Sequence, residues 1–271
     1  MIAAASSTEV SSLEMSTSSL CVVCSHQNSI ATAEKFAGDH QLPLCSEINQ
    51  DYDLQLCFGS ARLELYDRAL NTSIYVDFVE GALGHRLQYG GGRGQAIARA
   101  IGLKQGKTPS VLDITAGLAR DAWILASLGC RLTLVERSPV LAALIEDGIS
   151  RAQHTAGAAS ILASGFELVQ QDSTSYMAAL TATTRPDVIY MDPMYPERKK
   201  SALVKKDMQI LQHLLGKDNN AEALLGAALD CARKRVVVKR PAHAETVNSI
   251  PPSTSISSKK TRYDIYVIEK I

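Results

Sequence analysis

The chain has 271 residues, of which 46% are hydrophobic and 21% are charged. These values are typical of a globular protein and exclude charge-driven disorder and low-complexity classes. No apolar run approaches the roughly 18 residues that a membrane span requires, and no basic segment precedes an apolar one near the N-terminus. We therefore expect a cytoplasmic protein that does not enter a membrane.

The formal net charge of zero hides an uneven distribution along the chain. Residues 1–195 carry 13 Lys and Arg against 20 Asp and Glu, whereas residues 196–271 carry 15 against 8. The last part of the chain is basic and the rest is acidic. This distribution favours a protein that binds a polyanion on one of its surfaces.

Six cysteines are scattered through the sequence, and only Cys21 and Cys24 have the spacing of a motif. No second pair follows at zinc spacing, and the histidines show no metal-ligand pattern. The segment Leu-Cys-Val-Val-Cys is typical of a buried strand. We expect reduced, buried thiols and no metal site.

The N-terminal part shows the short alternating pattern of strands. Residues 54–58 and 63–65 alternate and are separated by Gly59-Ser60, which predicts a hairpin. Residues 74–78 alternate again. We expect a small β-rich domain over residues 1–78.

A glycine-rich connector follows over residues 79–108. Four of the five residues 90–94 are glycine, and residues 95–101 have the pattern of a short helix. The connector also carries arginines, which a plain flexible linker would not need.

From Ser110 the pattern alternates between strands and helices. Strands are predicted at 111–114, 131–136, 166–170, 187–191, 235–239 and 262–268, and helices at 120–128, 139–151, 203–215 and 221–232. Such alternation builds right-handed βαβ units. Residues 109–271 are therefore predicted to form an α/β domain with a mostly parallel, doubly wound sheet.

Ligands bind at the carboxyl ends of the strands in such a sheet, and three strand ends here are small or acidic. The first strand ends at Asp113 and runs into a tight turn at Gly117. The second ends at Glu136, 19 residues after Gly117, where a carboxylate can accept hydrogen bonds from both hydroxyls of a ribose. The third is followed by Asp172 and Ser173, which are placed to contact an adenine edge.

The fourth strand runs into Asp192-Pro193-Met194-Tyr195. Such a turn resembles the motif of methyltransferases that act on exocyclic amines. The lone pair of these amines is delocalised into the ring, so a carboxylate and a carbonyl accept the amine hydrogens while an aromatic ring stacks on the base. We predict that Asp192, Pro193 and Tyr195 are catalytic.

The sequence resembles one family more closely, through residues 78–94, the Asp113–Asp121 loop, the Leu-Val-Glu-Arg-Ser-Pro segment, Asp192–Pro196, 199–206 and Val236–Pro241. The family is RsmJ, and the resemblance covers residues 54–266. It implies a Rossmann-like class I methyltransferase fold, S-adenosylmethionine (SAM) as cofactor, and the N2 amine of a guanine in small-subunit ribosomal RNA as substrate. Ala119 stands where the family has glycine.

The resemblance also implies which residues contact the cofactor. Together with the strand-end residues, the expected set is Asp113, Gly117, Arg120, Asp121, Glu136, Arg137, Asp172, Ser173 and Asp192. We expect Trp123, on the helix that follows the cofactor loop, to be a core residue.

Basic residues after the strand ends are predicted to form a collar that binds RNA phosphates, within the small ribosomal subunit. The set is Arg86, Arg93, Lys199, Lys200, Lys205, Lys206, Lys239 and Arg240. Solvated helix faces are the alternative for the lysine pairs.

Two other functions fit part of this pattern. One is an amine methyltransferase that acts on another nucleic acid, for example on adenine N6. The other is a non-catalytic RNA-binding assembly factor, which the three strand-end acids Glu136, Asp172 and Asp192 disfavour. A nicotinamide enzyme is disfavoured because G-x-G-x-x-G is missing.

Overall fold

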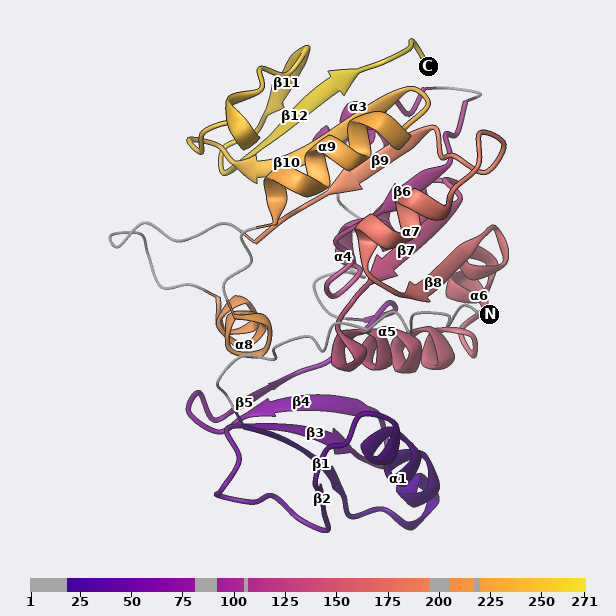
Figure 1. Cartoon of the computed structure of the whole chain (residues 1–271). Helices are drawn as coiled ribbons and strands as arrows, with labels where there is room; N and C mark the ends of the chain where they lie inside the picture. The colour runs from indigo at the N-terminus through magenta and orange to yellow at the C-terminus, as the bar shows by residue number, and fades with distance from the viewer. Residues whose placement is uncertain (1–18, 81–91, 105–106, 195–204, 217–219) are drawn as a thin grey trace, which may run out of the picture.

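A computed structural model describes residues 19–80, 92–104, 107–194, 205–216 and 220–271. Within these ranges the chain forms a five-stranded sheet from its N-terminal part and a seven-stranded sheet from residue 111 onward. In Figure 1 the two sheets lie at opposite ends of the molecule, with helices α5 and α8 between them.

The N-terminal sheet has the strand order β2-β1-β3-β4-β5. Its elements are β1 (Leu20–Cys24), α1 (Ile30–Asp39), β2 (Leu44–Cys45), β3 (Leu54–Phe58), β4 (Leu63–Asp67) and β5 (Thr72–Ile74). The predicted hairpin is the antiparallel pair β3–β4. The first three strands are parallel, and α1 lies in the crossover that a parallel pair requires.

Two expectations for this region need correction. The helix α1 was not predicted, so the unit contains a helix beside its strands. The predicted strand at 74–78 ends at Ile74, although Val76 and Phe78 continue the alternating burial. The expectation for Cys21 and Cys24 is confirmed, because all five residues of β1 are buried and both thiols are free.

One face of the N-terminal sheet packs against both α1 and the rest of the chain. Val22, Leu56 and Leu65 are register partners on neighbouring strands, so their side chains share this face. Val22 and Cys24 pack against α1, and Leu56 and Leu65 join the large hydrophobic core that also contains Leu144 of α5. The expected boundary at residue 78 thus falls between two sheets that share a core.

The second sheet has the order β11-β12-β10-β9-β6-β7-β8. Its strands are β6 (Val111–Asp113), β7 (Leu132–Glu136), β8 (Phe166–Gln170), β9 (Val188–Met191), β10 (Arg235–Pro241), β11 (Thr254–Ser257) and β12 (Thr261–Val267). Strands β6 to β10 pair in parallel, and β12 is antiparallel to β10. The strand order reverses between β6 and β9, which is where ligands bind in such folds.

Helices cover both faces of this sheet, which confirms the doubly wound prediction (Figure 1). Their bounds are α3 (Ala96–Ala100), α4 (Arg120–Ser127), α5 (Pro139–Ala152), α6 (Ala156–Ala163), α7 (Ser173–Ala179), α8 (Lys206–Leu215) and α9 (Ala221–Cys231), and short 3-10 turns occur at Gln27–Ser29, Gly92–Gly94 and Val247–Ser249. Helices α6 and α7 and strand β11 were not predicted. Trp123 of α4 is fully buried and stacks on Phe78 at 4.4 Å between ring centroids, so it is a core residue as expected.

Candidate active site

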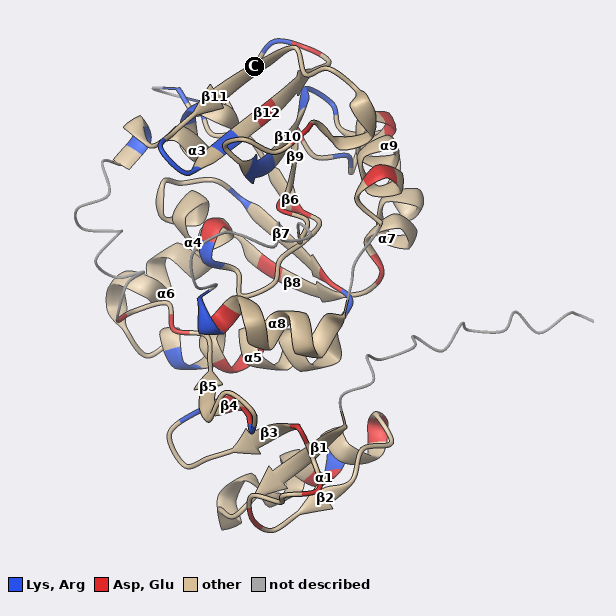
Figure 2. Ribbon diagram, turned by 90° about the vertical axis from the view of Figure 1, so that its left-hand side faces the viewer, with Lys and Arg blue, Asp and Glu red and all other residues tan. Residues whose placement is uncertain are grey.

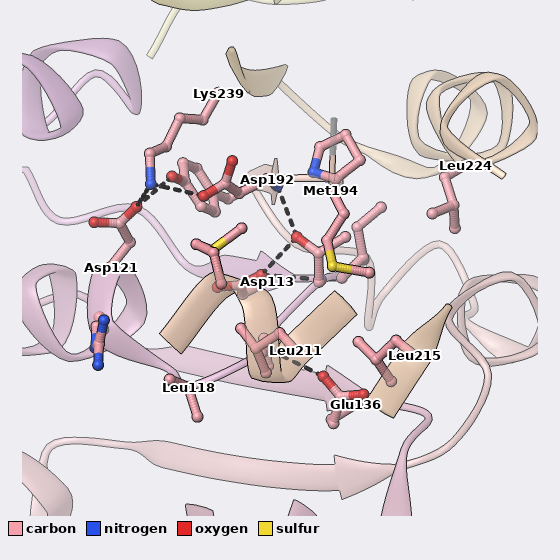
Figure 3. Close-up of a pocket in the computed structure, with 18 of the residues that line it drawn as sticks. Asp113, Leu118, Asp121, Glu136, Asp192, Met194, Leu211, Leu215, Leu224 and Lys239 are labelled. Atoms are coloured by element: carbon pink, nitrogen blue, oxygen red, sulfur yellow. Dashed lines mark hydrogen bonds and ion pairs between the residues drawn. The ribbon is translucent and has the colours of Figure 1, made fainter. Parts of the chain in front are cut away.

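A cavity of about 1090 Å³ opens at the carboxyl ends of β6, β7, β9 and β10, beside the point where the strand order reverses (Figure 3). Every described residue of the predicted cofactor set lines it: Asp113, Gly117, Arg120, Asp121, Glu136, Arg137, Asp172, Ser173 and Asp192. The residues at the predicted strand ends therefore lie around a single cavity.

The turn after β6 forms the floor of the cavity. The Asp113 carboxylate accepts a hydrogen bond from the Thr115 N–H at 3.0 Å, and the chain then turns through Gly117 and Ala119, both with φ near +55°. A left-handed residue is usually glycine, because a Cβ atom costs roughly 1 kcal/mol or more there. Ala119 holds this conformation at the position where the sequence departs from the family.

Glu136, at the end of β7, joins this turn to the next one. Its two carboxylate oxygens accept hydrogen bonds from the Gly117 N–H at 2.9 Å and from the Ser138 N–H at 2.8 Å. Burial raises the pKa of Glu136, while these hydrogen bonds and the nearby charge of Arg137 oppose the rise. Arg137 is half-buried at the cavity wall.

Asp172 and Ser173 line the cavity and also form hydrogen bonds that hold the fold together. The Asp172 carboxylate caps α7 by accepting from the Ser175 N–H at 2.9 Å. The buried Ser173 hydroxyl donates to the Ile114 carbonyl at 2.7 Å, which ties α7 to the turn after β6. Both residues line the cavity.

Asp192 follows β9 and faces the cavity beside Pro193. Its backbone N–H donates to the Thr115 hydroxyl at 2.7 Å, so the ends of β6 and β9 are fixed to each other. The side chain is 40% exposed, and its Oδ1 oxygen forms no hydrogen bond within the described part of the chain. Tyr195, the third predicted catalytic residue, lies outside the described residues.

Lys239 was predicted to bind RNA, and this assignment needs correction. Its ammonium group lies 2.7 Å from the Asp121 carboxylate and 2.6 Å from the Asp192 carboxylate, inside the cavity (Figure 3). The Tyr190 hydroxyl donates to the same Asp121 oxygen at 2.8 Å. The charge of Lys239 is thus balanced by two carboxylates within the protein.

Two further residues of the predicted collar lie away from the cavity. Arg240 is 5% exposed and donates to the Glu245 carbonyl, so it does not offer its charge to a ligand. Arg93 donates to the carbonyls of Lys104 and Leu128, beyond the end of α4 that is remote from the cavity. Arg86, Lys199 and Lys200 lie outside the described residues.

The lysines that do reach the cavity mouth come from two distant segments. Lys205 precedes α8, whose first residue Lys206 is also exposed, and Lys259 and Lys260 lie in the turn between β11 and β12. The side chains of Lys205, Lys259 and Lys260 form no ion pair with residues in the described ranges. In Figure 2, Lys and Arg gather over β10–β12, whereas the N-terminal sheet carries few. Sequence analysis missed the Lys259-Lys260 pair, whose adjacent positive charges were the available signal.

Helix α8 closes the cavity opposite the sheet. Leu211 and Leu215 line the cavity, as does Leu118 after β6 (Figure 3). The helix is held at both ends: Asp207 pairs with Arg120 at 2.7 Å, and His213 Nδ1 lies 2.5 Å from the buried Asp67 carboxylate of β4. Arg120 therefore contacts α8 as well as the cavity.

Five described acidic residues line this cavity: Asp113, Asp121, Glu136, Asp172 and Asp192. Burial raises the pKa of Asp113 to about 7, and the neighbouring carboxylates add to the effect. Such a cluster attracts a cationic organic ligand. In the ranges that the structure describes, no group of three or more His, Cys, Asp or Glu could hold a metal ion, and no helix is long and apolar enough to cross a membrane.

Comparisons with known proteins agree with this geometry. A family model described as "Putative SAM-dependent methyltransferase" matches residues 39–268. The ribosomal RNA small subunit methyltransferase J of Aeromonas salmonicida is 52% identical over 229 residues, which cover 83% of this chain and 91% of that protein. The same enzyme of Shewanella loihica is 55% identical over 194 residues, covering 72% and 74%. A crystal structure of a SAM-dependent methyltransferase from Neisseria gonorrhoeae matches with a TM-score of 0.71 at 29% identity, covering 91% of this chain and 95% of that one.

The fold and the site thus define a Rossmann-like, SAM-dependent methyltransferase. The residues fit the cofactor, because SAM carries a sulfonium and an ammonium cation that the acidic cluster would attract. The apolar side chains of Leu118, Leu141 and Leu224 also offer a surface to an adenine ring. More particularly, the chain belongs to the family of ribosomal RNA small subunit methyltransferase J.

Proposed function

We propose that the protein transfers a methyl group from SAM to the exocyclic N2 amine of a guanine in small-subunit ribosomal RNA. The names of the relatives support the RNA, and the motif resemblance supports the guanine amine. The observation that carries the chemistry is Asp192, which lines the same cavity as the predicted cofactor residues and whose side chain is 40% exposed.

The cavity is large enough to hold more than the cofactor. Ligand pockets commonly measure about 300–1000 Å³, and this one measures about 1090 Å³. One part is lined by Gly117, Glu136 and Asp172, which suit the cofactor. Another is lined by Pro193, Pro241 and His243, where a base extruded from the RNA could enter.

The protein's own contribution to the reaction is positioning and proton transfer. SAM supplies an electrophilic methyl group when bound. Asp192 would accept a hydrogen bond from the amine, which orients the nitrogen lone pair toward that methyl group. Pro193 restricts the backbone after Asp192, and the Thr115 hydroxyl fixes the Asp192 N–H. The acceptor is therefore in place before the base arrives.

Methylation of purified small ribosomal subunits that lack the modification tests this proposal directly. With labelled SAM, we expect label in N2-methylguanosine, and Asp192→Asn should lower the single-turnover rate by about 10²-fold or more while changing RNA affinity less than about threefold. Label in N6-methyladenosine would support the adenine alternative, and RNA binding without label would support the assembly factor. Naked ribosomal RNA as a parallel substrate would show whether the assembled subunit, and hence a cytoplasmic ribosomal partner, is required.

We also propose that RNA phosphates contact a basic rim formed by Lys205, Lys206, Lys259 and Lys260 at the cavity mouth. Lys205, Lys259 and Lys260 line the cavity from two separate segments, and Lys206 is exposed next to Lys205, which supports this assignment. The double variant Lys259→Met/Lys260→Met should weaken RNA binding and reduce its salt dependence by roughly 0.7–0.9 log units per lost phosphate contact. The matched control is Lys104→Met/Lys107→Met, a pair of exposed lysines at the remote end of the sheet. Equal salt slopes in both double variants would contradict the rim.

A further inference from the structure

Lys239 occupies a central place in the cavity that the proposed reaction does not yet explain. It lies in β10, where the register pairs Val238 with Met191 of β9, so the next residue in each strand, Lys239 and Asp192, lie side by side. The Lys239 ammonium group is within 2.7 Å of both Asp121 and Asp192, and its side chain is only 27% exposed. In Figure 3 it joins these two carboxylates on one side of the cavity.

The surroundings of Asp192 act on the pKa of its carboxyl in opposite directions. The cavity walls and the neighbouring Asp121 raise the pKa of the Asp192 carboxyl, and Lys239 opposes this rise by its charge and its hydrogen bond. The same two carboxylates raise the pKa of Lys239 above its ordinary value, although burial alone would lower it. The two carboxylates therefore favour the charged form of Lys239.

The contacts of Lys239 also fix which Asp192 oxygen is available. Oδ2 accepts from Lys239, whereas Oδ1 has no hydrogen-bond partner in the described part of the chain. Lys239 is itself held by Asp121, which the buried Tyr190 hydroxyl anchors. Tyr190, Asp121, Lys239 and Asp192 thus form a chain of contacts that ends on Asp192 Oδ2.

We propose that Lys239 is a positioning residue that keeps Asp192 ionised and directs its Oδ1 toward the target amine. This inference rests on the proposed function. In the reaction, the amine nitrogen forms the bond to the methyl carbon and the electron pair of the methyl–sulfur bond remains on sulfur. One amine proton then passes to Asp192 Oδ1 and from there to water. A protonated Asp192 could not accept that proton. Because the charge of Lys239 favours the ionised form of Asp192, it determines how far the pH can fall before proton transfer to Asp192 stops.

The pH dependence of the methyl-transfer step tests this role. Single-turnover rates would be measured between pH 5.5 and 9 with saturating SAM and small ribosomal subunits, for the full-length protein, Lys239→Met and Lys239→Arg. Lys239→Met should lose rate as the pH falls, so that its rate at pH 6 is less than a tenth of its own rate at pH 9. Lys239→Arg keeps the cation and should follow the profile of the unmodified protein.

Two additional variants separate this role from structural and RNA-binding effects. Lys239→Met/Asp121→Asn restores the local charge balance if the single variant folds poorly. Its pH profile should still differ from that of the unmodified protein, but by less than in the single variant, because Asp121 no longer raises the pKa of Asp192. Lys260→Met should change the salt dependence of RNA binding without shifting the pH profile. A Lys239→Met profile parallel to that of the unmodified protein would overturn the inference. Absence of methylguanosine with the unmodified protein would instead overturn the proposed function.

Discussion

Replacing Asp113 with asparagine should change how the stability of the protein depends on pH. Asp113 is only 3% exposed, and burial raises the pKa of its carboxyl from 3.8 to about 7. The carboxylates of Asp121, Asp192 and Glu136 add to this rise, and the hydrogen bond from the Thr115 N–H opposes it. Asparagine has nearly the same shape and can still accept the Thr115 hydrogen bond through Oδ1, but it does not titrate.

The sign of the effect follows from comparing the folded and unfolded states. Between about pH 4 and pH 7 the folded protein keeps the Asp113 proton that the unfolded chain has released, so stability falls as the pH rises. The fall stops above pH 7, where both states are ionised. With about 1.4 kcal/mol for each pKa unit, the folded state loses roughly 2.5 kcal/mol from this group between pH 5 and pH 8.

Urea unfolding without cofactor at pH 5 and pH 8 measures this contribution. The difference in unfolding free energy between the unmodified protein and Asp113→Asn should decrease by roughly 2.5 kcal/mol from pH 5 to pH 8. Asp51→Asn, a change at an exposed carboxylate in the N-terminal domain, serves as the control. A difference for Asp113→Asn that is the same at both pH values would refute this account of the buried carboxyl.

Three other changes have defined outcomes. Glu136→Ala removes the acceptor of the Gly117 N–H and should weaken SAM binding by roughly 1–3 kcal/mol. An unchanged SAM affinity in calorimetry would contradict the assignment of Glu136 to the cofactor site. Ala119→Gly relieves a left-handed alanine and should stabilise the protein by up to about 1 kcal/mol; a lower melting temperature would contradict this. Asp67→Ala leaves His213 of α8 without its buried partner and should cost roughly 1–3 kcal/mol in urea unfolding, and an unaltered midpoint would argue against the contact.

The α/β domain could be predicted well because its strands are continuous apolar runs that end in small or acidic residues. β6, β7 and β9 are almost entirely buried, and each is followed by a residue that lines the cavity. Buried strand residues and cavity-lining residues are therefore adjacent in the sequence. The cofactor site can be located from short segments, each made of a strand and the turn that follows it.

The elements that were not predicted, such as α6 and β11, lack a clear pattern of buried and exposed residues. Of α6, only Ala158 is buried, so the helix has no apolar stripe of the kind that a periodicity search detects. β11 is an edge strand without a buried residue. In both cases the conformation is imposed by neighbouring elements and not by a hydrophobic pattern of the segment itself.

The contacts that complete the site are mostly long-range, which is why the sequence did not reveal them. Asp67 and His213 are 146 residues apart, and Arg120 and Asp207 are 87 residues apart. Each pair joins α8 to a different part of the chain. Nothing in the local sequence around one partner indicates the other, so the position of α8 over the cavity is known only from the fold.

Lys239 and Arg240 illustrate a limit that strand geometry sets on the interpretation of charge. As neighbours in the sequence they suggest one basic patch, but successive side chains of a strand point to opposite faces of the sheet. Lys239 shares its face with Val237, on the side of α4, and reaches the carboxylates of the cavity. Arg240 shares its face with Val238, on the side of α9, and is buried against the Glu245 carbonyl. Two neighbouring basic residues inside a strand therefore cannot bind the same phosphate. Lys259 and Lys260 lie in a turn, where neighbouring side chains do not have to point to opposite faces.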